Sequence, residues 1–258
     1  MTQAAGTLYL IPVPLGPEDD PVRVLPPATI AATTGLDYFV AENARSARAV
    51  LGRLPMQRPI QQIEIRELNQ RTAPGALEDL LAPLRAGRDC GLVSEAGCPA
   101  VADPGAALVA LAHRAGVRVT PLIGPSALLL ALMASGMNGQ AFSFTGYVPV
   151  EPAQRAARLK ALEGRSAENA ETILMIETPY RNQVLFDEML RALRPDTTVT
   201  VCAELTLPGE QVRSRTVAEW RAQPAVLERE PAVFALQAAP RAPRQERVNE
   251  AARARRRR

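Results

Sequence analysis

Short apolar runs alternate with segments of helical periodicity through the first half of the chain. In one helical segment, residues 42–54, Ala44, Ala47, Leu51 and Leu54 recur on one face. The pattern predicts strands over 6–14, 36–41, 61–68, 91–94 and 116–123, separated by helices over 22–36, 42–54, 75–86, 105–114 and 124–136. Strict alternation of this kind predicts a mostly parallel sheet covered by helices on both faces.

The second half has a different pattern, because several apolar runs follow one another without a helix between them. Strands are predicted over 142–148, 171–176, 198–203 and 232–236, and helices over 153–163 and 182–193. Some of this pairing should therefore be antiparallel, which gives a mixed sheet. We expect two α/β domains, 1–120 and 121–240, followed by a basic, flexible tail over 241–258.

Composition narrows the class of protein. The chain is 47% hydrophobic and 22% charged, as globular domains are. No apolar run approaches the roughly 18 residues of a membrane span, and the N-terminus lacks the pattern of a signal peptide. Three cysteines, Cys90, Cys98 and Cys202, stand in no metal-ligand spacing beside the single His113. We expect a cytoplasmic protein with no membrane segment, disulfide framework or metal.

The charge is unevenly distributed. Residues 247–258 carry six arginines and one glutamate, a net charge of +5. Because the whole chain has a net charge of +3, the rest of the chain carries −2. Such a tail either grips phosphates, with strong dependence on salt, or serves only as a solubilising extension. The sequence leaves both readings open.

Three loops rich in Gly and Pro follow predicted strands, at residues 12–20, 94–105 and 124–127. In a parallel sheet such loops meet at the carboxyl edge, where ligands bind. Neither GxGxxG nor GxxxxGK[ST] occurs, so the Rossmann and P-loop fingerprints are missing. Each loop alone is more simply interpreted as a tight turn. There is no GxSxG motif, and His113 at the end of a predicted helix favours a structural role.

Taken together, seven stretches carry a family resemblance: PVPLG, AENAR, GLVSEAGCPAVADPG, RVTPLIGPSALLLALMASG, GYVP, IETPYR and AELTLPGE. In this order and spacing they resemble the tetrapyrrole methylase superfamily of S-adenosylmethionine-dependent methyltransferases. The chain is most similar to the ribosomal RNA small subunit methyltransferase I branch, which methylates a cytidine 2′-hydroxyl of 16S RNA. The resemblance runs from about Gly6 to Leu236.

The resemblance implies a two-domain homodimer that binds S-adenosylmethionine in the cleft between domains and releases S-adenosylhomocysteine, with no metal. Its RNA-modifying branch implies RNA, or the small ribosomal subunit, as partner. The residues implied for cofactor binding, largely through backbone atoms, are Pro14, Ser94, Glu95, Ala96, Gly97, Pro99, Ser126, Ala127, Ile176, Ala203 and Leu205.

The sequence departs from that branch near the presumed acceptor. Asn43 replaces the Asp of AEDTR, SDAGTP reads SEAGCP over 94–99, and a His-Asn-Glu element appears only as residues 67–70. Our catalytic candidates are Glu95, Glu42 and Arg45, with Arg181 as a phosphate ligand. Taken alone, each of them is more simply interpreted as a member of a structural ion pair than as a catalyst.

Two alternatives to RNA methylation remain open. One is methylation of a tetrapyrrole or another small molecule, although the GxGPGD-type first loop of those enzymes is absent. The other is a divergent protein that binds the cofactor or RNA without transferring a methyl group.

Overall fold

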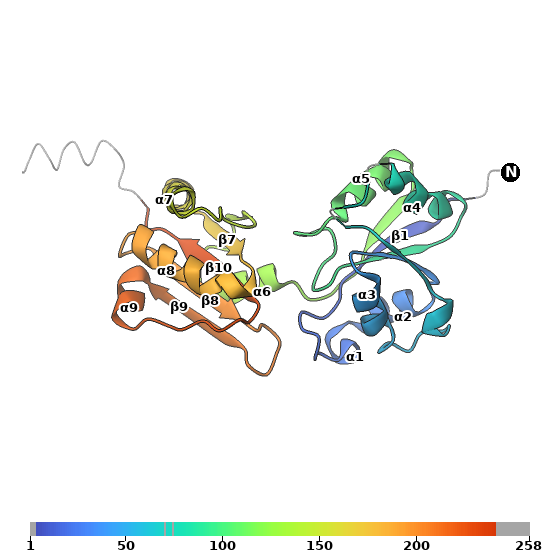
Figure 1. Cartoon of the computed structure of the whole chain (residues 1–258), viewed down its shortest axis with the longest axis horizontal. Helices are drawn as coiled ribbons and strands as arrows, with labels where there is room; N and C mark the ends of the chain where they lie inside the picture. The colour runs from blue at the N-terminus through green and yellow to red at the C-terminus, as the bar shows by residue number, and fades with distance from the viewer. Residues whose placement is uncertain (1–3, 70, 74, 241–258) are drawn as a thin grey trace, which may run out of the picture. The chain divides into compact units, whose positions relative to one another are not determined.

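The computed structural model describes residues 4–69, 71–73 and 75–240 (Figure 1). The chain forms two compact units, and the division falls between Ala127 and Leu128. The expected tail, 241–258, lies outside the described residues, as does Gln70 of the element over 67–70. Among the described residues, no helix is both long enough and apolar enough to cross a membrane.

The first unit is built on a parallel five-stranded sheet with the order β3-β2-β4-β1-β5. Its pairing register places Leu10 opposite Leu92 and Phe39 opposite Gly91. Every residue of β2 and β4 is buried, as expected for strands whose two faces are both covered. The strands are β1 (Thr7–Ile11), β2 (Tyr38–Ala41), β3 (Glu64–Glu67), β4 (Cys90–Val93) and β5 (Arg118–Pro121).

Each face of this sheet has its own core. The helices α4 (Ala76–Arg85) and α5 (Ala106–Arg114) cover one face. Leu81 of α4 and Leu108 of α5 pack there with Leu8, Val40 and Leu92 of the strands. Side chains of α3 (Ala44–Leu51), among them Leu51, pack on the other face with Ile11, Phe39 and Val93. Figure 1 shows α4 and α5 on one side of the strands and α2 (Pro27–Thr34) and α3 on the other. This confirms the predicted three-layer arrangement.

The second unit holds a mixed five-stranded sheet with the order β6-β7-β10-β8-β9. Among the strands that the structure describes here, β6 and β7 alone run parallel, while β10 pairs antiparallel with β7 and β8. The expected mixed sheet is therefore confirmed. The strands are β6 (Phe142–Phe144), β7 (Thr172–Ile176), β8 (Thr198–Ala203), β9 (Gln211–Thr216) and β10 (Ala232–Gln237).

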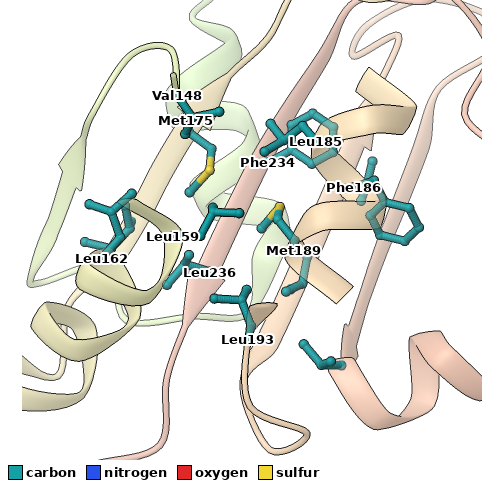
Figure 2. Close-up of a cluster of buried hydrophobic side chains, with 14 of the residues drawn as sticks. Val148, Leu159, Leu162, Met175, Leu185, Phe186, Met189, Leu193, Phe234 and Leu236 are labelled. Carbon is teal, nitrogen blue, oxygen red and sulfur yellow. The ribbon is translucent and has the colours of Figure 1, made fainter. Parts of the chain in front are cut away.

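The main core of the second unit lies between this sheet and the helices α7 (Pro152–Asn169), α8 (Asn182–Ala192) and α9 (Val217–Ala222). Figure 2 shows Leu159 of α7 and Met189 of α8 reaching toward Phe234 and Leu236 of β10. On the other side lies α6 (Ala127–Ser135), where the carbonyl of Ser135 accepts a hydrogen bond from the Ser214 hydroxyl of β9.

Several helix boundaries differ from the sequence prediction: the helix expected over 42–54 is α3, and the one expected over 124–136 is α6. The expected helix over 22–36 is a turn, α1 (Pro21–Val24), followed by α2, because Pro27 has no N–H and suits a first helical position. The helix expected over 153–163 continues to Asn169, since Gly164 is tolerated within it. Asp103 does not cap α5, whose N-cap is Gly105 without a side-chain bond.

Candidate functional site

The parallel strands of the first unit bring most of the sequence-predicted residues to one edge of the sheet. Pro14 follows β1, Glu42 follows β2, the loop 94–99 follows β4, and Ser126 follows β5. Because these four strands are neighbours in the order β2-β4-β1-β5, their loops converge at the carboxyl edge. The edge is therefore a candidate ligand site.

Two of these loops are joined by main-chain hydrogen bonds. The Val13 N–H donates to the Gly97 carbonyl over 2.9 Å, and the Gly97 N–H donates to the Val13 carbonyl over 3.2 Å. Gly97 has φ +69°, a conformation that disfavours L side chains, and an added Cβ would lie 3.2 Å from Leu15 Cδ2. The loop after β4 is thereby fixed against the loop after β1.

The loop after β5 approaches them closely as well. A Cβ at Gly124 would lie 2.4 Å from Pro12 Cβ, so only glycine allows this approach. The Cys98 thiol donates to the Pro125 carbonyl over 3.4 Å. Burial raises the pKa of Cys98, which keeps the thiol protonated and unsuited to nucleophilic attack.

The loop after β4 has main-chain N–H groups that can donate to a ligand. The buried Ser94 hydroxyl lies 3.2 Å from the carbonyls of both Ala96 and Gly97 and holds the turn. The amides of Ala96 and Cys98 donate to no group within 4–69, 71–73 or 75–240. Such amides, on backbone that glycine and proline let a ligand approach, fit a cofactor bound largely through backbone atoms.

The loop after β2 is organised by Asn43, the N-cap of α3. Its side-chain oxygen accepts hydrogen bonds from the amides of Arg45 and Ser46. Glu67, at the end of β3, accepts from the Ala44 amide over 3.0 Å. An asparagine therefore keeps the cap that the family's aspartate would provide, while the loop loses one negative charge.

Glu95 is tied to this helix. The Ser46 hydroxyl donates to Glu95 Oε1 over 2.8 Å and so links α3 to the loop after β4. The rest of the exposed Glu95 side chain faces solvent. This contact fixes where the Glu95 charge lies at the edge.

Three carboxylates, of Glu42, Glu95 and Asp103, act on one another electrostatically. Burial, with the charge of Glu95 second, raises the pKa of Glu42. Burial, followed by the charges of Glu42 and Glu95, raises the pKa of Asp103 to about 6. Glu42, Ser94 and Asp103 also line a cavity of about 10 Å³, room for about one water. Asp103 can therefore keep its proton up to about pH 6.

The remaining predicted residues belong to the second unit. Ile176 ends β7 and Ala203 ends β8, and both lie beside the start of β10, where Val233 pairs with Ile176 and Ala232 with Ala203. Leu205 follows in the next turn and is buried. These three residues therefore share one edge of the second sheet.

Arg181 is engaged with a carboxylate. Its guanidinium lies 2.8 Å from the buried carboxylate of Glu177, whose other oxygen accepts from the Thr178 amide. The pair stabilises the loop between β7 and α8. A phosphate at Arg181 would have to compete with Glu177 for the guanidinium.

Sequence reasoning missed Asp103 and Ser46 as members of the carboxylate group. Asp103 stands in an Asp-Pro-Gly run that resembles a helix start, which concealed its electrostatic role. Ser46 is one polar residue of a helix pattern, and only the packing of α3 against the loop after β4 reveals its contact.

Solved structures share the fold. The uroporphyrin-III-C-methyltransferase of Thermus thermophilus matches with a TM-score of 0.55 and 19% identity, over 90% of this chain and 92% of that one. A structure of the native form of the Thermus thermophilus enzyme matches with a TM-score of 0.52 and 19% identity, over 90% of this chain and 97% of that one. At this identity the likeness concerns the fold alone.

Curated relatives are closer in sequence. The ribosomal RNA small subunit methyltransferase I of Mesorhizobium japonicum is 36% identical over 81% of this chain and 67% of that protein. The protein of the same name from Synechocystis is 32% identical over 80% of this chain and 69% of that one. The protein of the same name from Xylella fastidiosa is 32% identical over 84% of this chain and 75% of that one.

The model of the family described as Tetrapyrrole (Corrin/Porphyrin) Methylases matches residues 7–220, which cover both sheets except β10. The match includes the loops after β1, β2, β4 and β5 that form the candidate site. The chain belongs to the tetrapyrrole methylase family.

Proposed function

We propose that this chain is an S-adenosylmethionine-dependent methyltransferase that methylates a ribose 2′-hydroxyl in the RNA of the small ribosomal subunit. The observation that carries the proposal is the identity of 36% and 32% to relatives named ribosomal RNA small subunit methyltransferase I. The absence of a GxGPGD-type first loop, replaced here by residues 12–16, supports RNA over a tetrapyrrole.

The methyl donor would be held chiefly by the loop 94–99, with its open amides at Ala96 and Cys98. Pro14, Ser126 and Ala127 contribute from the loops after β1 and β5, and Ile176, Ala203 and Leu205 contribute from the second unit. When bound, S-adenosylmethionine supplies an electrophilic methyl group on a sulfonium. No metal is needed for such a transfer.

The acceptor hydroxyl must lose its proton as the C–O bond forms. Glu42 and Glu95 are the proposed groups that orient this hydroxyl or receive its proton, and the raised pKa of Glu42 suits it to that exchange. Arg45 and Arg181 are the proposed phosphate ligands. Positioning of the two reactants supplies much of the rate, because the transfer needs an in-line approach.

We further propose that the protein works as a homodimer in the cytoplasm. Sedimentation at several protein concentrations tests the dimer, since a monomer at the concentration of the activity assay would contradict it.

Transfer of a radiolabelled methyl group tests the activity. The full chain is incubated with labelled S-adenosylmethionine and either small ribosomal subunits or free ribosomal RNA, both from a strain lacking the protein. Label in RNA supports the proposal. Label in neither, together with label in a tetrapyrrole offered in parallel, would assign the chain a small-molecule acceptor. Binding of donor or RNA without any transfer would make it a binding protein.

A further inference from the structure

Arginines at the two edges of the first sheet have different partners. At the amino edge, Arg88 precedes β4 and lies 2.9 Å from Asp37 Oδ1, and it also pairs with Glu64. Arg58 pairs with Asp37 over 3.4 Å. These ion pairs connect the starts of neighbouring strands, so the charges of Arg88 and Arg58 are neutralised within the fold.

At the carboxyl edge, three arginines have no such partners. Arg45 and Arg48 lie on α3, after β2, and Arg71 lies in the loop after the neighbouring strand β3. All three side chains are exposed. Within the part of the chain that the structure describes, none of their guanidinium groups makes an ion pair or hydrogen bond. We call Arg45, Arg48 and Arg71 the edge arginines.

Carboxylates are present at the same edge but do not neutralise the edge arginines. Glu95 accepts from Ser46, and Glu67 accepts from the Ala44 amide. Glu42 and Asp103 interact electrostatically with Glu95 rather than with an arginine. Two sets of opposite charge therefore stand at one edge without pairing, which leaves the arginines available to an external anion.

Helix electrostatics make the position of Arg45 unfavourable for folding alone. Arg45 occupies the first turn of α3, where the helix dipole disfavours a positive charge. Arg48 lies three residues later, in the last turn of this short helix, where the dipole favours a cation, but it shares a side of the helix with Arg45 and repels it. An anion bound across both side chains would remove the repulsion and would also lie near the amino end of the helix.

We propose that the edge arginines bind the phosphate backbone of the RNA whose ribose 2′-hydroxyl accepts the methyl group. This inference rests on the proposed function, and it adds Arg48 and Arg71 as RNA-binding residues. Guanidinium groups bind phosphates through paired hydrogen bonds, without reading sequence. The nearby carboxylates repel phosphates, so the backbone is confined to the arginine side while the acceptor hydroxyl turns toward Glu42 and Glu95.

The test compares Arg48→Gln/Arg71→Gln with a matched control, Arg114→Gln/Arg118→Gln. Arg114 ends α5 and Arg118 begins β5, so both lie toward the amino edge. They are exposed and make no side-chain contact in the described ranges. Each variant loses two positive charges from the full chain. Binding of deproteinised small-subunit RNA is measured over a range of salt concentrations.

The edge variant should weaken RNA binding, and its slope of log affinity against log salt should fall by about 1.4 to 1.8, for two lost phosphate contacts. The control should retain the slope, and both variants should bind the methyl donor like the wild type. Equal slopes in all three proteins, or an equal loss in both variants, would overturn the proposal. Preferential loss of an acidic protein partner without loss of RNA binding would also overturn it.

The outcomes separate this inference from the proposed function. If the wild type transfers methyl groups to RNA and the edge variant matches it in KM and salt slope, only the role of the edge arginines fails. If the wild type neither binds nor methylates RNA, the proposed function fails first.

Discussion

Val13 and Gly97 exchange two main-chain hydrogen bonds, of 2.9 and 3.2 Å, although each lies beyond the strand that precedes it. This pairing ties the loop after β1 to the loop after β4 at the carboxyl edge of the first sheet. It holds the proposed donor-binding loop in place before any ligand arrives. Preorganisation of this kind reduces the entropy cost of binding.

Gly97→Ala should lower both stability and donor affinity. An alanine at φ +69° costs about 1 to 2 kcal/mol, and its Cβ would press on Leu15. Gly116 also has φ +69°, but a Cβ there has open space. Gly116→Ala should therefore lose similar stability and keep its donor affinity. Calorimetric titration with S-adenosylmethionine and urea unfolding measure the two effects, and equal donor affinities in the two variants would contradict the proposed loop function.

Glu95→Gln should reduce methyl transfer by at least about tenfold, since it removes a charge beside the proposed acceptor while keeping the side-chain shape. The amide can still accept from Ser46, so folding should be unaffected. Ser46→Ala removes the contact and leaves the charge, and its effect on kcat should be smaller. Unchanged turnover and donor affinity in Glu95→Gln would remove this residue from the site.

Asp103→Asn should change how stability depends on pH. The folded-state pKa of about 6 lies above the ordinary value of 3.8 for an aspartate, so the stabilisation is complete below about pH 4 and is lost as pH rises through 6. The variant lacks this loss. Its free energy of unfolding should therefore rise relative to that of the wild type between pH 4.5 and about 7. Solvent screening moderates the size, because the carboxyl is only partly buried. Urea unfolding at several pH values measures this effect. A difference in unfolding free energy between the two proteins that stayed constant with pH would contradict the raised pKa.

Phe186→Ala should destabilise the second unit by about 3 to 5 kcal/mol. The Phe186 ring is fully buried and meets Trp220 edge-on, with ring centroids 5.1 Å apart. Figure 2 shows Phe186 on α8, the helix that also carries Leu185 and Met189. Val184 on the same helix is 47% exposed, so Val184→Ala should cost less than about 0.5 kcal/mol. Equal costs in thermal unfolding would contradict the assigned packing.

The strands and their sheet types could be predicted from the sequence better than the side-chain contacts. Apolar runs such as residues 91–94 are buried on both faces, so their periodicity and flanking glycines marked strands that the structure confirms. The Val13–Gly97 pairing could not be predicted, since it depends on β1 and β4 becoming neighbours. Asp103 stands in an Asp-Pro-Gly run typical of a helix start, yet it caps no helix and belongs to the carboxylate group, which depends on tertiary packing.

The most direct test of the central claim is mass spectrometry of nucleosides from small-subunit RNA methylated in vitro. The RNA comes from a strain lacking the protein and is incubated with the full chain and S-adenosylmethionine that carries an isotopically labelled methyl group. The proposed function predicts labelled 2′-O-methylcytidine, and much less of it with Glu95→Gln. Label on a base, or no label in RNA from either intact subunits or free RNA, would contradict it.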